Sequence, residues 1–238
     1  MGQTDLLVLA GGLGTRLRAA VSDVPKPLAP VAGRPFLSYQ LASWVGQGVT
    51  SLTFLLQHQA GLIEAFLQGQ DAASRLHGCP VRTLTEPQPL GTGGAIAFAV
   101  RELQLTESFL VANADTWLGS AIGRVAAARA PAMAAIEVGN TGRYGSVIVA
   151  GDKVLAFTEK QSGACAGWIN AGVYHLQASL FTDWRGQPFS LESELLPMLS
   201  SAGRLDVALL QTQFIDIGVP EDYLRFCRWI ESGRAGAP

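Results

Sequence analysis

Short apolar runs alternate with stretches of helical periodicity along the chain up to about residue 140. Buried parallel strands are nearly continuous apolar runs, and such runs occupy residues 6–10, 51–56, 81–85 and 109–112. Between them, apolar side chains recur at helical spacing near residues 36–44, 62–67 and 95–102. Alternation of this kind is typical of βαβ units, so it predicts an α/β fold around a mostly parallel sheet.

The pattern changes after about residue 140. Residues 146–150 and 153–158 flank Gly151 and Asp152, which is the signature of a β-hairpin, so we expect antiparallel strands to extend the sheet. Later elements are expected as strands at residues 168–174 and 214–217 and as helices at residues 191–199 and 221–230.

Composition narrows the class of protein. With 238 residues, 48% of them hydrophobic and 15% charged, the chain can bury a large core, and we expect one domain over residues 1–238. A net charge of −2 without a basic run argues against nucleic acid or an anionic membrane as a partner. No signal peptide or membrane span is recognisable, so a cytoplasmic location is expected.

A glycine-rich segment, residues 10–17, directly follows the first expected strand. At the carboxyl end of a parallel strand, such a turn brings backbone N–H groups close to phosphate oxygens, which predicts polyphosphate binding. The segment is not a P-loop, and Leu17 stands where a dinucleotide fingerprint needs its third glycine. A tight turn without a ligand is the alternative at this point.

Two cations lie close to this turn. Arg16 belongs to the glycine-rich segment itself, and Lys26 stands between Pro25 and Pro27, which restrict the backbone on either side of it. A stiff loop presents a charge at a low cost in ordering entropy. We therefore expect both side chains to bind phosphate.

Two aspartates are candidate ligands of a hard cation. Asp115 comes just after an apolar strand, where a parallel sheet exposes its ligand-binding groups. Asp216 lies in the apolar run 214–217, where an unpaired carboxylate would be costly to bury. Together they predict a Mg²⁺ site completed by water and phosphate oxygens. A helix-cap or turn aspartate is the alternative for Asp115.

These motifs together resemble the sugar-1-phosphate nucleotidyltransferases. The glycine-rich segment and the Pro-Lys-Pro-Leu stretch at 25–28 are similar to the N-terminal signature of that family. The likeness covers nearly the whole chain, continuing through residues 86–95, 113–116, 143–145, 159–160, 169–172 and 214–218. One departure is Ala114, because many members have glycine before the metal-binding aspartate; the methyl group bears on loop geometry and not on the metal.

The resemblance implies a fold and a reaction. The fold is a Rossmann-like three-layer α/β sandwich with a mostly parallel mixed sheet, the nucleotide-diphospho-sugar transferase fold. In the reaction, a phosphate oxygen of a sugar 1-phosphate attacks the α-phosphorus of an NTP in line, and pyrophosphate leaves. The attacking oxygen is already anionic at neutral pH, so catalysis rests on positioning and charge neutralisation and needs no general base.

The resemblance also assigns roles to residues. The expected catalytic residues are Arg16 on the β and γ phosphates, Lys26 between the α-phosphate and the sugar phosphate, and Asp115. The expected nucleotide-binding residues are Ala10, Gly11, Gly12, Gly14, Thr15, Gln88, Gly91 and Thr92. The expected sugar-phosphate-binding residues are Gly145, Glu159, Lys160 and Asn170. The expected Mg²⁺ ligands are Asp115 and Asp216.

Within the family, the motifs most resemble the short D-glycero-α-D-manno-heptose 1-phosphate guanylyltransferases, which make GDP-heptose for bacterial surface glycans. This resemblance implies GTP and a sugar 1-phosphate as substrates and Mg²⁺ as the cofactor. Relatives that use mannose 1-phosphate with GTP, or N-acetylmuramate or hexose 1-phosphates with UTP, share most of these residues and remain alternatives.

Two other classes of protein share some of these features. A dinucleotide-dependent oxidoreductase needs an acidic residue at the end of the second strand, where Gln57 and His58 stand, and is disfavoured. A non-catalytic sugar-nucleotide sensor would keep the fold without the reaction. A homo-oligomer is also possible, because Phe226 and Trp229 of the last helix could pack in the core of the chain or contact a second copy.

Overall fold

The computed structural model describes residues 4–14, 16–17, 20–21, 24–158 and 165–233. The expected site residues Thr15, Glu159 and Lys160 therefore lie outside the described residues. The chain divides into two compact units: unit 1 is Met1–Gln88, Ala112–Ser120 and Gln213–Pro238, and unit 2 is Pro89–Val111 and Ala121–Thr212. The single domain expected from length stays a prediction.

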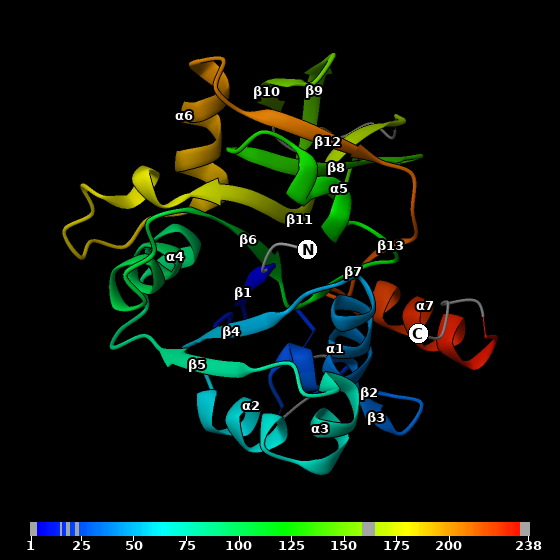
Figure 1. Ribbon diagram of the computed structural model, residues 1–238. Coiled ribbons are helices and arrows are strands. Elements are labelled where there is room, and N and C mark those ends of the chain that lie inside the picture. The colour runs from blue at the N-terminus through cyan, green and yellow to red at the C-terminus, as the bar shows by residue number, and fades with distance from the viewer. Residues whose placement is uncertain (1–3, 15, 18–19, 22–23, 159–164, 234–238) are drawn as a thin grey trace. The chain divides into compact units, whose positions relative to one another are not determined.

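Unit 1 contains a parallel set of three strands. Strand β4 (Ser51–Leu56) pairs in parallel with β1 (Asp5–Leu9) on one side and β5 (Val81–Thr85) on the other. The connections between them carry helices α1 (Phe36–Gly46), α2 (Ala60–Leu67) and α3 (Gln70–Leu76) (Figure 1). The expected βαβ units are thus confirmed here, and only α3 was not predicted.

Short elements complete unit 1. They are the 3-10 turn η1 (Lys26–Leu28), β2 (Pro30–Val31), β3 (Arg34–Pro35), β7 (Thr116–Leu118), β13 (Phe214–Asp216) and α7 (Pro220–Glu231). Strands β7 and β13 pair antiparallel, with Asp216 opposite Thr116. Under them, the buried Phe226 ring lies 4.8 Å from Phe36 and 5.4 Å from Trp117 between centroids. Phe226 is therefore a core residue of its own unit.

Unit 2 is built on mixed strand pairings. Strand β8 (Ala132–Val138) pairs antiparallel with β11 (Gly167–Gln177) and parallel with β12 (Asp206–Leu210). Strand β10 (Lys153–Thr158) pairs antiparallel with β9 (Ser146–Ala150) and with β12. The expected hairpin is confirmed, and its turn residue Gly151 has φ 58°, a conformation that favours glycine.

Helices cover parts of unit 2. They are α4 (Gly91–Glu102), α5 (Ile122–Ala127), the 3-10 turn η2 (Ala178–Phe181), the π-helical turn η3 (Leu191–Leu195) and α6 (Leu196–Ser201). Strand β6 (Ser108–Asn113) begins in unit 2 and ends in unit 1. Helix α4 begins at Gly91, earlier than the residue 95 expected from periodicity. Within the part of the chain that the structure describes, no helix has both the length and the apolar character needed to cross a bilayer.

Candidate active site

Asp115 lies between two backbone hydrogen bonds and the start of a strand in unit 1. The N–H of the preceding Ala114 donates to the Leu9 carbonyl at the end of β1, at 3.0 Å. The Asp115 carbonyl accepts from the N–H of Ile217, just after β13, at 3.0 Å. Strand β7 begins at the next residue, Thr116. These strands fix the Asp115 backbone, and they leave its side chain partly exposed, at 28%.

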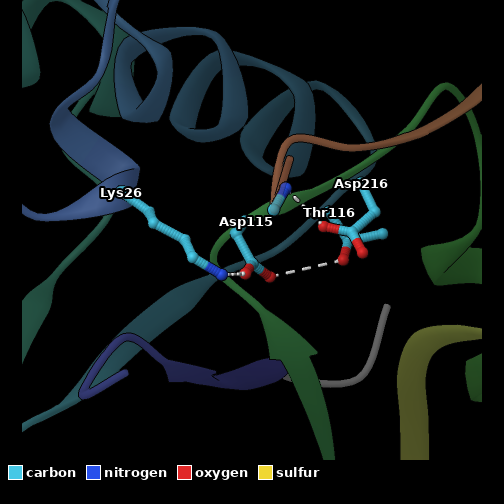
Figure 2. Close-up of polar contacts among 5 residues, drawn as sticks. Lys26, Asp115, Thr116 and Asp216 are labelled. Carbon is cyan, nitrogen blue, oxygen red and sulfur yellow. Dashed lines mark hydrogen bonds and ion pairs between the residues drawn. The ribbon is translucent and has the colours of Figure 1, made fainter. Parts of the chain in front are cut away.

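Lys26 forms an ion pair with this carboxylate. Its Nζ atom lies 3.0 Å from Asp115 Oδ2, and the Lys26 side chain is only 15% exposed. Figure 2 shows the lysine side chain pointing at Asp115. Pro25 and Pro27 on either side of it are buried, so the stiff loop expected from the sequence presents the ammonium group at a fixed place.

Asp216 lies next to this pair, on β13. Its Oδ1 atom accepts a hydrogen bond from the Gly218 N–H at 2.7 Å. Burial raises the pKa of Asp216, and the nearby negative charge of Asp115 raises it further. The Gly218 bond and the positive charges of Lys26 and Arg16 act in the opposite direction. The fold thus brings Arg16, Lys26, Asp115 and Asp216 into electrostatic contact.

The two carboxylates fit a divalent cation. A buried carboxylate beside another carboxylate is unfavourable when both are charged, and a cation between them would offset that repulsion. Within the described ranges, no group of three or more His, Cys, Asp or Glu side chains could hold a metal ion. Asp115 and Asp216 would therefore need water and phosphate oxygens to complete the coordination, which is how Mg²⁺ is commonly bound.

Gly218 is a site residue that sequence reasoning missed. A Cβ atom at this position would lie 2.8 Å from Asp216 Oδ1 and 3.4 Å from Lys26 Nζ. A larger residue would therefore push on the Asp216 carboxylate and would touch the Lys26 ammonium group. The signal was present in the sequence, because a glycine two residues after an aspartate allows a tight turn back onto the carboxylate.

The glycine-rich turn packs against the same lysine. Gly14 has φ +65°, and a Cβ atom there would lie 2.9 Å from Lys26 Cγ. Around Gly12, no described atom lies within 4 Å of the place of a Cβ. Ala10, which leads into the turn, is buried and donates its N–H to the Leu55 carbonyl at 3.0 Å. Arg16, two residues after Gly14, is exposed. The turn therefore packs on Lys26 at Gly14 and is open at Gly12.

Two further buried polar residues of unit 1 were not predicted. Glu86, 9% exposed, follows β5, and its Oε1 atom would lie 3.3 Å from a Cβ atom at Gly11. Gln40, 1% exposed, donates from Nε2 to the Thr116 carbonyl at 2.7 Å. Gln40 thus steadies the start of β7 directly after Asp115. For Gln40, the available signal was a polar residue inside an apolar helix stripe, since buried polar groups are normally hydrogen-bonded.

The remaining expected nucleotide-binding residues fall in both units. Gln88 is exposed at the end of a segment of unit 1. In unit 2, Gly91 is exposed with φ +72°, and the Thr92 hydroxyl donates to Glu192 Oε2 at 2.6 Å. Thr92 is thus bound by a neighbouring side chain of its own unit.

The described sugar-phosphate candidates lie in unit 2. Asn170, on β11, donates from Nδ2 to Tyr174 Oη at 2.8 Å and accepts at Oδ1 from the Gly172 N–H at 2.9 Å. Its pairing with β8 shifts register after Asn170, and such bulges often re-aim side chains. Gly145 is exposed, with the Thr158 carbonyl 3.4 Å from the place of a Cβ. The two hydrogen bonds of Asn170 thus hold its amide in one orientation.

A model of the nucleotidyl transferase family matches residues 6–232. The chain belongs to this family. It is 33% identical over 225 residues to D-glycero-alpha-D-manno-heptose 1-phosphate guanylyltransferase of Aneurinibacillus thermoaerophilus, over 92% of this chain and 95% of that protein. The protein of the same name from Campylobacter jejuni is 32% identical over 223 residues, over 92% and 97% of the two chains. Mannose-1-phosphate guanylyltransferase catalytic subunit beta of Danio rerio is 32% identical, but the match spans 66% of its length.

Solved structures agree with this membership. The crystal structure of HddC from Yersinia pseudotuberculosis superimposes with a TM-score of 0.83 at 31% identity, over 96% of this chain and all (100%) of that one. HddC complexed with GMP-PN gives a TM-score of 0.81. A UDP-glucose pyrophosphorylase with a TM-score of 0.80 is only 17% identical, so this likeness shows the fold alone. The expected Rossmann-like α/β class of the nucleotidyl transferases is confirmed.

Proposed function

We propose that this protein transfers GMP from GTP to D-glycero-α-D-manno-heptose 1-phosphate, giving GDP-heptose and pyrophosphate. The observation that carries the proposal is the Lys26–Asp115–Asp216 cluster beside a glycine-rich turn, in a chain 33% and 32% identical to two heptose 1-phosphate guanylyltransferases. The product would serve bacterial surface polysaccharide synthesis, and the enzyme would work in the cytoplasm, where GTP is available.

The charges of unit 1 suit this reaction. A new bond forms between the sugar phosphate oxygen and the α-phosphorus, the bond to the β-phosphate oxygen breaks, and pyrophosphate takes the electron pair. Lys26 would neutralise charge on the α-phosphate and the sugar phosphate while Asp115 holds its ammonium group in place at 3.0 Å. Arg16 would bind the β and γ phosphates. Preorganised charges of this kind stabilise the transition state without a proton transfer.

We also propose Mg²⁺ as the cofactor, held by Asp115 and Asp216. When bound, it would neutralise negative charge on the triphosphate. The residues support this assignment because burial and Asp115 both raise the pKa of Asp216, so the charged pair is costly without a cation. Calorimetric titration of Mg²⁺ in the presence of a non-hydrolysable GTP analogue tests it, and Asp216→Asn should weaken Mg²⁺ binding at least tenfold, since removing one charged ligand usually costs more than about 1.4 kcal/mol.

Glu86 supports the choice of guanine. Guanine presents donors at N1 and N2, which a carboxylate accepts in pairs, whereas uracil and thymine present one donor between two acceptors. Glu86 opens the segment 86–95, which the family resemblance places against the base, and its carboxylate approaches Gly11. We expect Glu86→Gln to reduce the preference for GTP over UTP, measured as the ratio of kcat/KM values, because the amide no longer rejects acceptors.

Mannose 1-phosphate with GTP is the second candidate, favoured by the 32% identity to the Danio rerio mannose-1-phosphate guanylyltransferase subunit. Pyrophosphate release in the presence of Mg²⁺ tests the choice. GTP, UTP, dTTP, CTP and ATP are each combined with manno-heptose, mannose, glucose and N-acetylmuramate 1-phosphates. Release confined to GTP and the heptose phosphate supports the proposal, and release with another pair replaces the substrate. Nucleotide binding without release by any pair favours a sensor.

A further inference from the structure

The first turn of α4 is bound by a distant segment of its own unit. The N–H groups of Gly93 and Gly94 donate to the Phe189 carbonyl at 3.0 and 3.2 Å. In return, the Phe189 N–H donates to the Leu90 carbonyl at 3.0 Å. The first N–H groups of a helix have no acceptor within the helix, and here the chain itself supplies one. We call residues 187–192 the clasp segment.

The glycines of α4 fit closely under the clasp segment. A Cβ atom at Gly91 would lie 2.6 Å from the Phe189 carbonyl oxygen, and one at Gly93 would lie 2.2 Å from the Phe189 ring. Real Cβ atoms do not approach other atoms so closely, since the repulsion at such distances is steep. Glycine at these two positions is therefore required by packing, and the place of Gly91 depends on the place of Phe189.

The clasp segment is itself well anchored within unit 2. Trp184 donates from its ring N–H to the Gln187 carbonyl at 2.7 Å, and the Arg101 guanidinium of α4 lies over the Trp184 ring at 5.0 Å. The Phe189 and Phe181 ring centroids are 6.5 Å apart. Cation–π and aromatic contacts of this kind restrict the side chains of Trp184 and Phe189, and so they hold the clasp segment in place.

Thr92 and Glu192 form the polar link between the two elements. The Thr92 hydroxyl donates to Glu192 Oε2 at 2.6 Å and accepts from the Leu191 N–H at 2.9 Å. A hydroxyl has one proton to donate, so that donor is already committed inside unit 2. The bond to a carboxylate is of the stronger, charge-assisted kind. Thr92 therefore ties the first turn of α4 to the start of η3.

We infer that Thr92 and Glu192 are positioning residues for nucleotide binding, which set the backbone of the exposed Gly91 through the clasp segment. The inference rests on the proposed function and on the expectation that Gly91 binds the nucleotide. Gly91 immediately precedes Thr92 and adopts a left-handed backbone, φ +72°. A shift of the Thr92 link would move this residue directly. The side chain of Thr92 acts on the nucleotide through the backbone and not by touching it.

The experiment compares Thr92→Val with Thr92→Ser in the full chain. Valine keeps the shape and removes the hydroxyl, whereas serine keeps the hydroxyl. Thr92→Val should raise the KM for GTP, and its Kd by calorimetry, about tenfold with kcat within about twofold, because lost binding shared by ground and transition states appears in KM. Thr92→Ser should stay within about twofold of the wild type in all three quantities, and Glu192→Ala should resemble Thr92→Val.

Glu194→Gln is the matched control. It removes the same charge from the same turn, but Glu194 Oε1 accepts from the Ser190 N–H at 2.8 Å and is not a partner of Thr92. Its Kd for GTP should equal that of the wild type. The inference is overturned if this control weakens GTP as much as Thr92→Val does, if serine fails to rescue, or if Thr92→Val lowers kcat and leaves KM and Kd unchanged.

The same measurements separate the inference from the proposed function. A wild-type protein that binds GTP and releases no pyrophosphate with any sugar phosphate contradicts the proposed function. The Kd values of the variants then still decide the role of Thr92 and Glu192. If another NTP binds more tightly than GTP, that NTP is used as the probe. A wild-type protein that binds none of the NTPs overturns both.

Discussion

The molecule contains two glycine-rich segments, and they are glycine-rich for different reasons. In the first, after β1 in unit 1, a Cβ atom at Gly12 would meet no described atom within 4 Å. In the second, at the start of α4 in unit 2, a Cβ atom at Gly93 would lie 2.2 Å from the Phe189 ring. At Gly12 the first segment leaves space, although a Cβ atom at Gly14 of the same segment would lie 2.9 Å from Lys26 Cγ, whereas the start of α4 is filled by its own chain. Glycine therefore leaves an open backbone at one position in unit 1 and allows close packing at the start of α4.

The polar groups near the two segments differ in the same way. Beside the first segment lie full charges, Lys26, Asp115 and Asp216, and burial with a like charge raises the pKa of Asp216. Around the second segment, Thr92 has a donor and an acceptor partner within hydrogen-bond distance. In unit 1, burial and the neighbouring Asp115 thus make the charged form of Asp216 costly, whereas in unit 2 the hydroxyl of Thr92 has both of its partners.

The largest effect is expected from the charge of unit 1. Lys26→Met should lower kcat for pyrophosphate release by roughly a hundred- to a thousandfold, as loss of one preorganised charged contact does. The control is Lys153→Met in unit 2, which also breaks an ion pair, with Asp206. That variant should keep kcat and lose only some stability. A Lys26→Met enzyme with near wild-type kcat would contradict the assignment.

Alanine at each glycine-rich segment tests the contrast itself. Gly91→Ala combines a left-handed backbone with an approach of 2.6 Å to the Phe189 carbonyl, so it should lower the free energy of unfolding by about 2 to 3 kcal/mol. Gly12→Ala has space and should change stability by less than about 0.5 kcal/mol, while raising the KM for GTP. Urea unfolding and steady-state kinetics give both quantities. Equal stability losses would show that the two segments do not differ as described.

Much of the fold was predictable because its signals are local. The patterns of parallel strands and the turn at Gly151 predicted β4, β5, β9 and β10 with the bounds that the structure has, although β5, which was expected to be buried, has only half-buried and exposed residues. The early start of α4 was not predictable from helix propensity, since glycines disfavour helix. Its first turn is stabilised by bonds from Phe189, a residue far along the chain. Strands β8 and β12, which pair with each other, were also not predicted, although both are short apolar runs.

The candidate site was predictable as residue types and not as a geometry. Proline on both sides of Lys26, and an aspartate after a buried strand, indicated a phosphate and cation site. The sequence could not show that β13 pairs with β7 and so brings Asp216 beside Asp115. Gly218, Glu86 and Gln40 were missed because their importance comes from atoms that approach them in space. The roles expected of Thr15, Glu159 and Lys160, outside the described residues, stay predictions.

Asp216→Asn separates stability from activity in unit 1. Asparagine keeps the acceptor for the Gly218 N–H and removes a charge whose pKa burial and Asp115 raise. In EDTA, the variant should therefore be more stable than the wild type by about 1 kcal/mol, while its turnover with Mg²⁺ falls. Asp183→Asn on the exposed surface of unit 2 is the control and should change neither. A destabilised Asp216→Asn protein in EDTA would argue against stored electrostatic strain.

Tyr223→Phe tests an uncharged hydrogen bond in unit 1. The Tyr223 hydroxyl donates to the Pro30 carbonyl, near the η1 turn that carries Lys26, so its loss should cost about 1 kcal/mol of stability at neutral pH. It should leave kcat nearly unchanged because no charge is altered. A large fall in kcat would mean that the position of Lys26 depends on α7 as well as on its flanking prolines.

The pH dependence of Tyr223→Phe identifies the hydroxyl as the cause. Burial, with Cys227 adding to it, raises the pKa of Tyr223 from 10.0 to about 12. Between these values the unfolded chain releases the phenol proton while the folded chain keeps it, so the folded wild type loses stability as pH rises from about 10 toward 12. Phenylalanine has no proton to release, and the advantage of the wild type over the variant should therefore shrink between pH 9 and pH 11, measured by urea unfolding. An advantage that stays constant over this range would contradict the raised pKa of Tyr223, because it would show that the folded and unfolded chains release the phenol proton over the same pH range.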